Sequence, residues 1–398
     1  MDRICASDRC TGCAACIDSC PKHCITMVSD ELDALHPIID KEICVDCGLC
    51  GKTCPNNVEL VYRQSQKVWA AWSNDDEVRK TSASGGIAYE FYRHWVKIGG
   101  VATGVIYDRD EGCHFILIKD NSDIAATKNS KYTFSDTCGI YKKVKKYLDL
   151  GTPVLFVGVP CQVAGLLGYL KKDYNELTTV DIICHGMPPA SYLSQHVKSI
   201  EKKKNRLAEY LSFRDPNFET YTYTFTLRDS KARVFYKRKV LGIDNYQLGY
   251  HKALIYRENC YTCPYARKER IADLTIGDFS GLGRCAPLYF ARLNTSCVLQ
   301  NTDKGADLLS QMSRISLIER PKSEAFDFEK QLKSPSVRHP KRDVFVNEYR
   351  RTKNFKLASN KALAKEKVTV LKTALIQKFK AFVYNWLVIV GILKNTHV

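Results

Sequence analysis

Eight cysteines lie in two runs near the N-terminus, and their spacing suits thiolate ligands of a metal site. The first run is CTGCAACIDSCP, residues 10–21, and the second is CVDCGLCGKTCP, residues 44–55. Both read C-x2-C-x2-C-x3-C-P, and each cysteine of the second run follows its counterpart by 34 residues. This constant offset indicates an internal duplication. Because closely spaced thiolates hold iron–sulfur clusters or zinc, the pattern predicts metal chemistry.

The spacing is similar to that of bacterial ferredoxins, which hold two 4Fe–4S clusters. In that arrangement the first three cysteines of a run hold one cluster, and the fourth holds the other. We therefore expect one cluster on Cys10, Cys13, Cys16 and Cys54, and a second on Cys44, Cys47, Cys50 and Cys20. Zinc is the alternative, but it explains neither the four-cysteine runs nor the duplication. Cys5 and Cys24 fall outside the pattern and are interpreted as packing or free thiols.

Four further cysteines are far apart in the sequence. Cys161 and Cys184 each follow a strand-like apolar run, PVLFVG and TVDII, and Cys260 and Cys263 form a C-x2-C pair. The carboxyl ends of strands are where open α/β sheets form ligand crevices. Four thiolates suffice for another 4Fe–4S cluster. Buried cysteines also serve as small apolar side chains, so both interpretations stay open at this point.

A Ser/Gly-rich turn, TSASGG, directly precedes a helix-like segment. Ser84, Gly85 and Gly86 would expose backbone N–H groups there, which suits a phosphate or an electron-rich ring. Serine is also an ordinary helix N-cap, so the turn alone does not distinguish a binding role from a structural one.

Several segments, taken in order, resemble one known family. They are SASGG, SKYTFS, VLFVGVPCQVAGL, IICHGMP, CYTCPYARKERIADLTIGDFSG and NTSCVLQNTDKG, between about Asp8 and Gly305. On these motifs the chain is identified as a member of the family of coenzyme F420 hydrogenase/dehydrogenase beta subunits, preceded by a ferredoxin domain. Members of that family are iron–sulfur flavoproteins that bind FAD and move electrons between clusters and a two-electron acceptor.

The resemblance implies cofactor sites at particular residues. It implies a third 4Fe–4S cluster on Cys161, Cys184, Cys260 and Cys263. It also implies a flavin site lined by Ser84, Gly85, Gly86 and Lys131. Lys131 and His185 are the catalytic candidates, as electrostatic or proton support near the flavin; the alternative for His185 is to orient the Cys184 turn. Asp273 and Asp278 belong to the same motif, or hold the ends of strands.

The elements expected to position these residues form a mixed fold, α+β or α/β. Residues 1–66 are predicted to be a small duplicated ferredoxin-like domain. Residues 67–320 alternate strand-like and helical segments, and are predicted to be the flavin- and iron–sulfur-binding body, with parts at about 67–150 and 151–320. The segment between Leu207 and Val240 alternates as an antiparallel hairpin would. Residues 321–398 are predicted to be a linker and a C-terminal helix.

The C-terminal region is basic and ends in an apolar stripe. Residues 341–380 carry twelve Lys/Arg and three Asp/Glu, whereas residues 1–66 carry six and ten. From Leu371 to Leu393, apolar residues recur at three- and four-residue spacing, which predicts an amphipathic helix too short to span a bilayer. We expect it to pack on the protein, to lie on a membrane surface or to bind a partner. Nucleic-acid binding is not expected, because phosphate contacts do not explain the stripe.

Composition excludes several classes of protein. With 398 residues, 45% hydrophobic and 26% charged, the chain is expected to be globular, neither disordered nor fibrous. No apolar signal segment is visible at the N-terminus, so the eighteen cysteines are expected to serve metal or redox chemistry in the cytoplasm, not disulfides. Peripheral contact with the inner face of the membrane is an alternative location. The remaining cysteines are interpreted as core or surface thiols: Cys113, Cys138, Cys285 and Cys297.

Together these patterns predict an enzyme, an iron–sulfur flavin-dependent oxidoreductase. It would exchange electrons with ferredoxin or another redox protein, and would reduce or oxidise a small organic molecule. Because relatives with fused ferredoxin domains occur among polysaccharide-biosynthesis genes, a surface-glycan precursor is one candidate substrate. The alternatives are an F420-dependent oxidoreductase subunit and a non-catalytic electron-transfer subunit of a partner enzyme.

Overall fold

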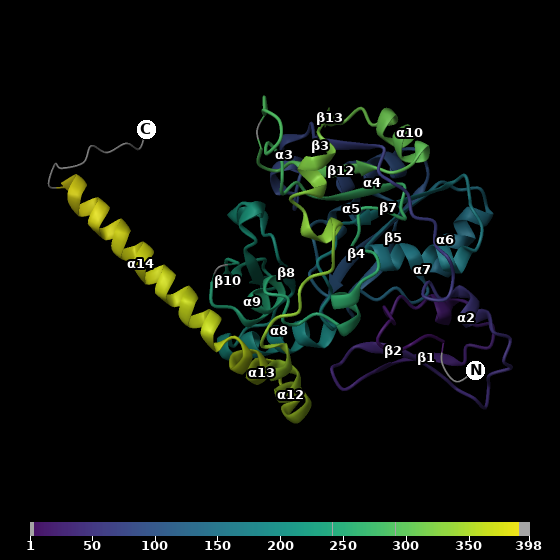
Figure 1. The fold of residues 1–398 in the computed structure, drawn as a ribbon, viewed down its shortest axis with the longest axis horizontal. Coiled ribbons are helices and arrows are strands. Elements are labelled where there is room, and N and C mark those ends of the chain that lie inside the picture. The colour runs from purple at the N-terminus through teal and green to yellow at the C-terminus, as the bar shows by residue number, and fades with distance from the viewer. Residues whose placement is uncertain (1–3, 241, 291, 390–398) are drawn as a thin grey trace.

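The structure, a computed structural model, describes residues 4–240, 242–290 and 292–389 (Figure 1). Its N-terminal domain is built on the duplication. Each cysteine run enters a short helix, α1 (Ala15–Asp18) or α2 (Leu49–Thr53), and an antiparallel hairpin of β1 (Ile25–Ser29) and β2 (Leu35–Ile39) lies between them in the chain. A residue in the left-handed conformation precedes each helix, Ala14 in the first copy and Gly48 in the second, and turns the chain sharply after a cysteine.

An eight-stranded mixed sheet forms the body, in the order β13-β3-β12-β11-β7-β6-β4-β5. The strands are β3 (Lys67–Ser73), β4 (Val101–Asp108), β5 (Gly112–Ile118), β6 (Val154–Gly158), β7 (Leu177–Ile182), β11 (Leu274–Asp278), β12 (Ser296–Gln300) and β13 (Ile315–Glu319). The central strands β4, β6, β7 and β11 are parallel, and the other neighbouring pairs are antiparallel. The predicted mixed α/β body is confirmed.

Helices cover both faces of this sheet. They are α3 (Asp76–Thr81), α4 (Ile87–Lys97), α5 (Asn121–Thr127), α6 (Ile140–Asp149), α7 (Pro160–Leu170) and α10 (Asp303–Gln311). Side chains alternate along β6, so that Leu155 and Val157 pack with α4 and α10, whereas Val154 and Phe156 pack with α6 and α7. Burial on both faces explains why β6 is continuously apolar.

A second core lies beside the sheet. It contains α8 (Ala190–Lys204), α9 (Asn245–His251), α12 (Arg342–Thr352), α13 (Phe355–Ala362) and a three-stranded sheet of β8 (Tyr210–Ser212), β9 (Phe225–Arg228) and β10 (Val234–Arg238). The antiparallel pair β9–β10 confirms the predicted hairpin. Leu32, between β1 and β2, is buried in this core. The hairpin of the N-terminal domain is thereby anchored on the body.

The chain after residue 320 is more structured than the linker that the sequence predicts. It forms α11 (Lys322–Phe326), followed by α12, α13 and α14 (Ala364–Ile389). Phe345, Tyr349 and Phe355 are fully buried in the second core. A few large aromatic side chains therefore anchor these short helices, although their polar surfaces dominate the sequence.

Helix α14 extends away from the rest of the molecule (Figure 1). Leu371, Leu375 and Phe379 are exposed on it, so packing on the protein itself is not found for these residues. Membrane-surface and partner contacts of this helix stay predictions, and Leu393 lies outside the described residues. Of the helices that the structure describes, none combines the length and the apolar character needed to cross a membrane.

Candidate functional site

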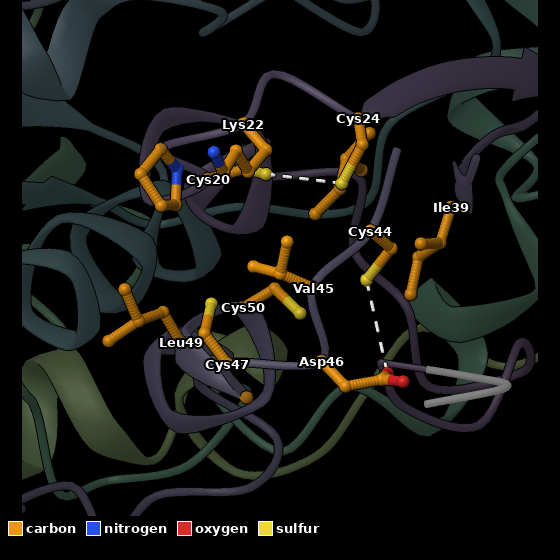
Figure 2. A pocket seen from close by; sticks show the side chains of 13 residues that line it. Cys20, Lys22, Cys24, Ile39, Cys44, Val45, Asp46, Cys47, Leu49 and Cys50 are labelled. Carbon is orange, nitrogen blue, oxygen red and sulfur yellow. Dashed lines mark hydrogen bonds between the residues drawn. The ribbon is translucent and has the colours of Figure 1, made fainter. Parts of the chain in front are cut away.

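The N-terminal domain contains two cysteine-lined cavities, and we name the more exposed one the outer cavity (Figure 2). Cys44, Cys47 and Cys50 of the second run line it together with Cys20 of the first run. Cys47 is exposed, and Cys44 and Cys50 are half-buried. Cys24 is a fifth thiol in this cavity, with its Sγ 3.4 Å from that of Cys20. One predicted quartet therefore lies together, and the structure adds Cys24 to it.

The inner cavity, which is the second one, is lined by Cys5 and by the other predicted quartet: Cys10, Cys13, Cys16 and Cys54. Of this quartet, Cys13 is half-buried and the other three are buried. Asn57 brings the start of the chain to this place, because its side-chain amide donates to the Ile4 carbonyl at 2.6 Å. The sequence pattern misses both Cys5 and Cys24; only the four-residue spacing from Cys20 to Cys24 could have indicated one of them.

The body holds the loop of the inner cavity. The buried Arg257 guanidinium donates to the backbone carbonyls of Thr11 at 2.5 Å and Leu35 at 3.0 Å. A Cβ on Gly12 would lie 2.8 Å from this guanidinium, and φ at Gly12 is +66°, so the position requires glycine. Arg257 lies more than 200 residues from its partners. No local motif indicates Arg257, so its role could not be predicted from the sequence.

Asp18 makes a second contact between the inner loop and the body. Its carboxylate accepts from the N–H groups of Gly139 at 2.8 Å and Tyr141 at 3.1 Å, at the N-terminus of α6. A helix N-terminus favours a negative charge, although burial raises the pKa of Asp18. The first copy of the duplicated motif therefore docks on α6.

A third cavity, the body cavity, lies at the carboxyl edge of the main sheet. Cys161 is in the first turn of α7, directly after β6, and Cys184 follows β7. Because β6 and β7 are parallel neighbours, both cysteines come to the same edge. Cys260, in a 3-10 turn over Glu258–Thr262, and Cys263 complete the set. The structure brings these four cysteines together from three separate segments.

The inner and body cavities are adjacent. Thr11 lines both of them. Cys13 packs against the same apolar core as Cys161 and Cys263. Helix α7 approaches Cys13 so closely that a Cβ on Gly165 would lie 3.1 Å from its Sγ. Cysteines of the outer and inner cavities pack in one apolar cluster, so the inner cavity adjoins both of the other cavities.

Burial raises the pKa of several of these thiols. It raises the pKa of both Cys13 and Cys263 to about 11. It also raises the pKa of Cys161, and the neighbouring Cys184 adds to the effect. A thiolate at such a position needs a cationic partner such as a metal, whose binding displaces the thiol proton.

The donor sets suit iron–sulfur clusters. Within the described residues, no three His, Cys, Asp or Glu side chains are close enough to hold a single metal ion. Instead, four of the predicted cysteines line each cavity, which is the donor set of a 4Fe–4S cluster.

The Ser/Gly turn before α4 is partly occupied by contacts within the protein. Ser84 Oγ donates to the Thr295 carbonyl at 3.2 Å, and the Gly85 N–H donates to Ser296 Oγ at 2.8 Å. A Cβ on Gly85 would lie 2.3 Å from the Ala71 carbonyl oxygen, so packing alone requires this glycine. A structural role of the turn therefore has direct support at Gly85.

Other polar groups around this turn have no protein partner. Among the described residues these include the buried side-chain oxygens of Ser82 and Asn129. Gly86 precedes α4 without a side-chain cap, which leaves the first N–H groups of the helix without a side-chain acceptor. Since buried polar groups are normally hydrogen-bonded, these atoms fit a site for a polar ligand.

Lys131 lies next to this region. Its ammonium donates to the carbonyls of Thr127 and Lys128, each at 2.9 Å, at the C-terminal end of α5. Burial lowers the pKa of Lys131 to about 8. In this structure the side chain therefore caps a helix, a role that favours a positive charge.

Arg214 is the centre of a buried network at the same turn and could not be predicted from the sequence. Arg214 pairs with Asp278 and donates to the Ala83 carbonyl. It also donates to the Tyr132 hydroxyl at 2.8 Å, and its guanidinium lies 3.9 Å from the centroid of the Tyr223 ring. Burial opposes the charge on Asp278, but Arg214 outweighs it and lowers the pKa of that carboxyl. No spacing pattern links Arg214 to Asp278, because 64 residues separate them.

His185 and Asp273 have different surroundings. His185 lines the body cavity, and its carbonyl accepts from Ser336 Oγ at 2.6 Å. Burial lowers the pKa of its imidazole. Asp273 accepts from the hydroxyls of Thr179 at 2.7 Å and Thr302 at 2.8 Å, so it ties β11 to its neighbours. Away from the three cavities, Cys113 and Cys297 are buried, and Cys138 and Cys285 are exposed.

Two parts of the chain match known protein families. Residues 151–324 match the family of the C terminus of the coenzyme F420 hydrogenase/dehydrogenase beta subunit, and residues 9–58 match the 4Fe–4S dicluster domain. The chain is similar to the F subunit of the F(420)H(2) dehydrogenase from Methanosarcina mazei, 22% identical over 44% of this chain and 53% of that protein. It is also similar to the coenzyme F420-dependent sulfite reductase of Methanocaldococcus jannaschii, 24% identical over 47% of this chain and 29% of that protein.

These matches span about half of the first relative and less than a third of the second. A solved structure of the F420-reducing [NiFe] hydrogenase complex from Methanosarcina barkeri aligns with 76% of this chain and 91% of its own, with 17% identity and a TM-score of 0.45.

Proposed function

Residues 151–324 belong to the family of the C terminus of coenzyme F420 hydrogenase/dehydrogenase beta subunits and residues 9–58 to the 4Fe–4S dicluster family, and from this premise we propose that the protein is an iron–sulfur flavoprotein oxidoreductase. It exchanges electrons between a ferredoxin-type redox protein and a two-electron acceptor. The two families indicate iron–sulfur electron transfer. In addition we propose the flavin, the acceptor and the catalytic role.

One observation carries the proposal: the body cavity shares the wall residue Thr11 with the inner cavity. A half-buried thiol quartet built from three distant segments has no evident structural purpose by itself. Its position next to the cysteines of the N-terminal domain supports a role in electron transfer between the domain and the body. The body quartet consists of Cys161, Cys184, Cys260 and Cys263.

In this proposal the outer, inner and body quartets each hold one 4Fe–4S cluster. Clusters of this kind supply one-electron transfer, and a flavin combines single electrons into a pair. The chain's own residues fix the distances and exclude water. Arg257 and Asp18 hold the inner loop against the body, and Gly165 allows α7 to approach Cys13.

We further propose that FAD binds beside the turn at Ser84, Gly85 and Gly86. The unpartnered oxygens of Ser82 and Asn129 and the uncapped N-terminus of α4 are suitable partners for its polar groups. Lys131, with its pKa lowered to about 8, is still protonated at neutral pH and can balance negative charge on a bound ligand. His185 lies between this region and the body cysteines and is the candidate for proton support.

The acceptor is a small organic molecule. F420 is the specific candidate that the names of the matched relatives favour. A surface-glycan precursor stays a prediction from the resemblance alone. Turnover with purified F420 and with other two-electron acceptors separates these cases, and turnover that requires a second protein would identify the chain as a relay subunit.

The test is the cofactor content of the anaerobically purified full chain. We expect about twelve iron and twelve sulfide per chain, the content of three 4Fe–4S clusters, together with one flavin. Cys161→Ser should lower the iron content to about eight, because one cluster loses a ligand. Cys285→Ser is the matched control, since Cys285 is exposed and lies outside the three cavities, and it should keep the wild-type content. A wild-type chain with about eight iron and no flavin would contradict the proposal.

A further inference from the structure

The outer cavity has an apolar rim. Val45 and Leu49 line the cavity beside the exposed Cys47 (Figure 2), and Ile43 directly precedes the lining residue Cys44. The side chains of Ile43, Val45 and Leu49 are 50%, 59% and 37% exposed. We call these three residues the apolar rim.

The duplication indicates that the cysteine loop itself does not require the apolar rim. The residues 34 positions earlier are Arg9, Thr11 and Ala15. Thr11 and Ala15 are buried against the body. The buried copy therefore has small or polar residues, while the exposed copy has large aliphatic ones. Since burial stabilises apolar side chains and exposure does not, folding stability does not explain this distribution.

A binding surface does explain it, because apolar patches on an otherwise polar surface mark interaction sites. We propose that the apolar rim is the docking surface for a small, soluble one-electron carrier protein, one that presents an apolar patch around its own redox centre. This inference rests on the proposed function, in which the outer quartet holds a cluster. Of the twelve cysteines in the three quartets, Cys47 is the exposed one. The outer cavity is thus where a partner can approach bound iron most closely.

The charges around the outer cavity favour this partner over a membrane surface. Lys22 and Asp46 both line the cavity, one of each sign. A membrane-binding surface would instead carry a group of basic residues. A contact that is mainly apolar and small in area suits an electron-transfer complex, which must form and dissociate quickly.

The test measures binding to the full, cluster-containing chain under anaerobic conditions. The probe is a bacterial two-cluster 4Fe–4S ferredoxin, and its Kd is determined by isothermal titration calorimetry. Ile43→Glu and Ile43→Lys place opposite charges on the rim outside the lining of the cavity, and each should raise the Kd about tenfold because an unpaired charge would be buried in the contact. Ile38→Glu is the matched control: Ile38 is 52% exposed and faces away from Ile39, which lines the cavity. It should leave the Kd unchanged within about twofold.

Two further readouts separate this inference from the proposed function. Iron content and the rate of reduction by methyl viologen radical, which needs no docking surface, should be the same in the wild type and both Ile43 variants. Equal ferredoxin affinity in the wild type and these variants, or no measurable affinity in the wild type, overturns the docking surface, while unchanged iron content and methyl viologen reduction leave the clusters of the proposed function intact. A change in self-association by sedimentation velocity without a change in ferredoxin binding also overturns it, because the rim would then contact a second copy of the chain.

Discussion

The inner and outer cysteine quartets have the same spacing and very different surroundings. In the inner copy, Thr11 and Ala15 are buried and Arg257 of the body holds the loop. In the outer copy, Val45 and Leu49 stand exposed beside Cys47. The comparison teaches that a duplicated ligand pattern does not imply a duplicated role. The cysteine loop of the first copy is a contact with the body, whereas that of the second is open to solvent, although α2 behind it packs against α7.

A single pair of equivalent residues illustrates the difference. Asp18 in the first copy corresponds to Lys52 in the second, 34 residues later. Asp18 is buried and accepts N–H groups at the start of α6, whereas Lys52 is exposed. A lysine at the first position would present a positive charge to a helix N-terminus, which is unfavourable. The two copies could not exchange places.

The largest effect is expected from removing equivalent cysteines. Cys16→Ser and Cys50→Ser should each lose about four iron per chain. Because metal binding stabilises small cluster domains, loss of the inner cluster should also release the N-terminal domain from the body, whereas loss of the outer cluster should not. Iron analysis and limited proteolysis between residues 58 and 66 measure the two effects. Equal protease sensitivity of the two variants would show that the quartets are not structurally different.

The next largest effect is expected from Arg257→Ala. It leaves the carbonyls of Thr11 and Leu35 without their charged donor, which should destabilise the N-terminal domain by about 3 kcal/mol. The urea midpoint for loss of the visible cluster absorbance measures this change. Arg257→Lys should restore part of it, and Arg233→Ala, at an exposed surface pair, should change stability by less than about 0.5 kcal/mol.

Asp18→Ala tests the other contact of the inner loop. It leaves three N–H groups at the start of α6 without this acceptor and should cost about 1–3 kcal/mol in the same urea experiment. Lys52→Ala, the equivalent change in the outer copy, should stay within about 0.5 kcal/mol of the wild type. Similar costs for both variants would contradict the idea that Asp18 makes a contact with the body that Lys52 does not make.

The smallest effect is expected at the hairpin. Tyr349 of α12 donates its hydroxyl to Asp33 at 2.6 Å, beside the buried Leu32. Tyr349→Phe should cost about 1 kcal/mol and increase amide hydrogen exchange in β1 and β2, with little change in α2. Hydrogen-exchange mass spectrometry measures both segments. Tyr289→Phe, at a fully solvated side chain, serves as the control. Uniform exchange changes across the domain would argue against a local anchor.

Several features could be predicted because their signals are local. The two runs indicated which cysteines belong together, and β6 and β7 were visible as apolar runs that place Cys161 and Cys184 at one edge. Arg257 and Arg214 could not be predicted, because their partners lie far away in sequence and follow no periodicity. The C-terminal helix was predicted, but α11 and α12 were missed, because a few buried aromatics such as Phe345 and Tyr349 hold α12, which is otherwise polar.

By itself the sequence determined the number, type and spacing of the thiols, since the first three cysteines of each run are close enough in the chain to converge on one site. Tertiary structure alone decided which cysteine loop is held by Arg257 and Asp18 contacts and which is exposed at Cys47. The physical reason is the range of the contacts: Arg257 meets Thr11 across 246 residues of chain, and Asp18 meets Gly139 across 121. Only the folded sheet and its helices bring those groups within hydrogen-bonding distance.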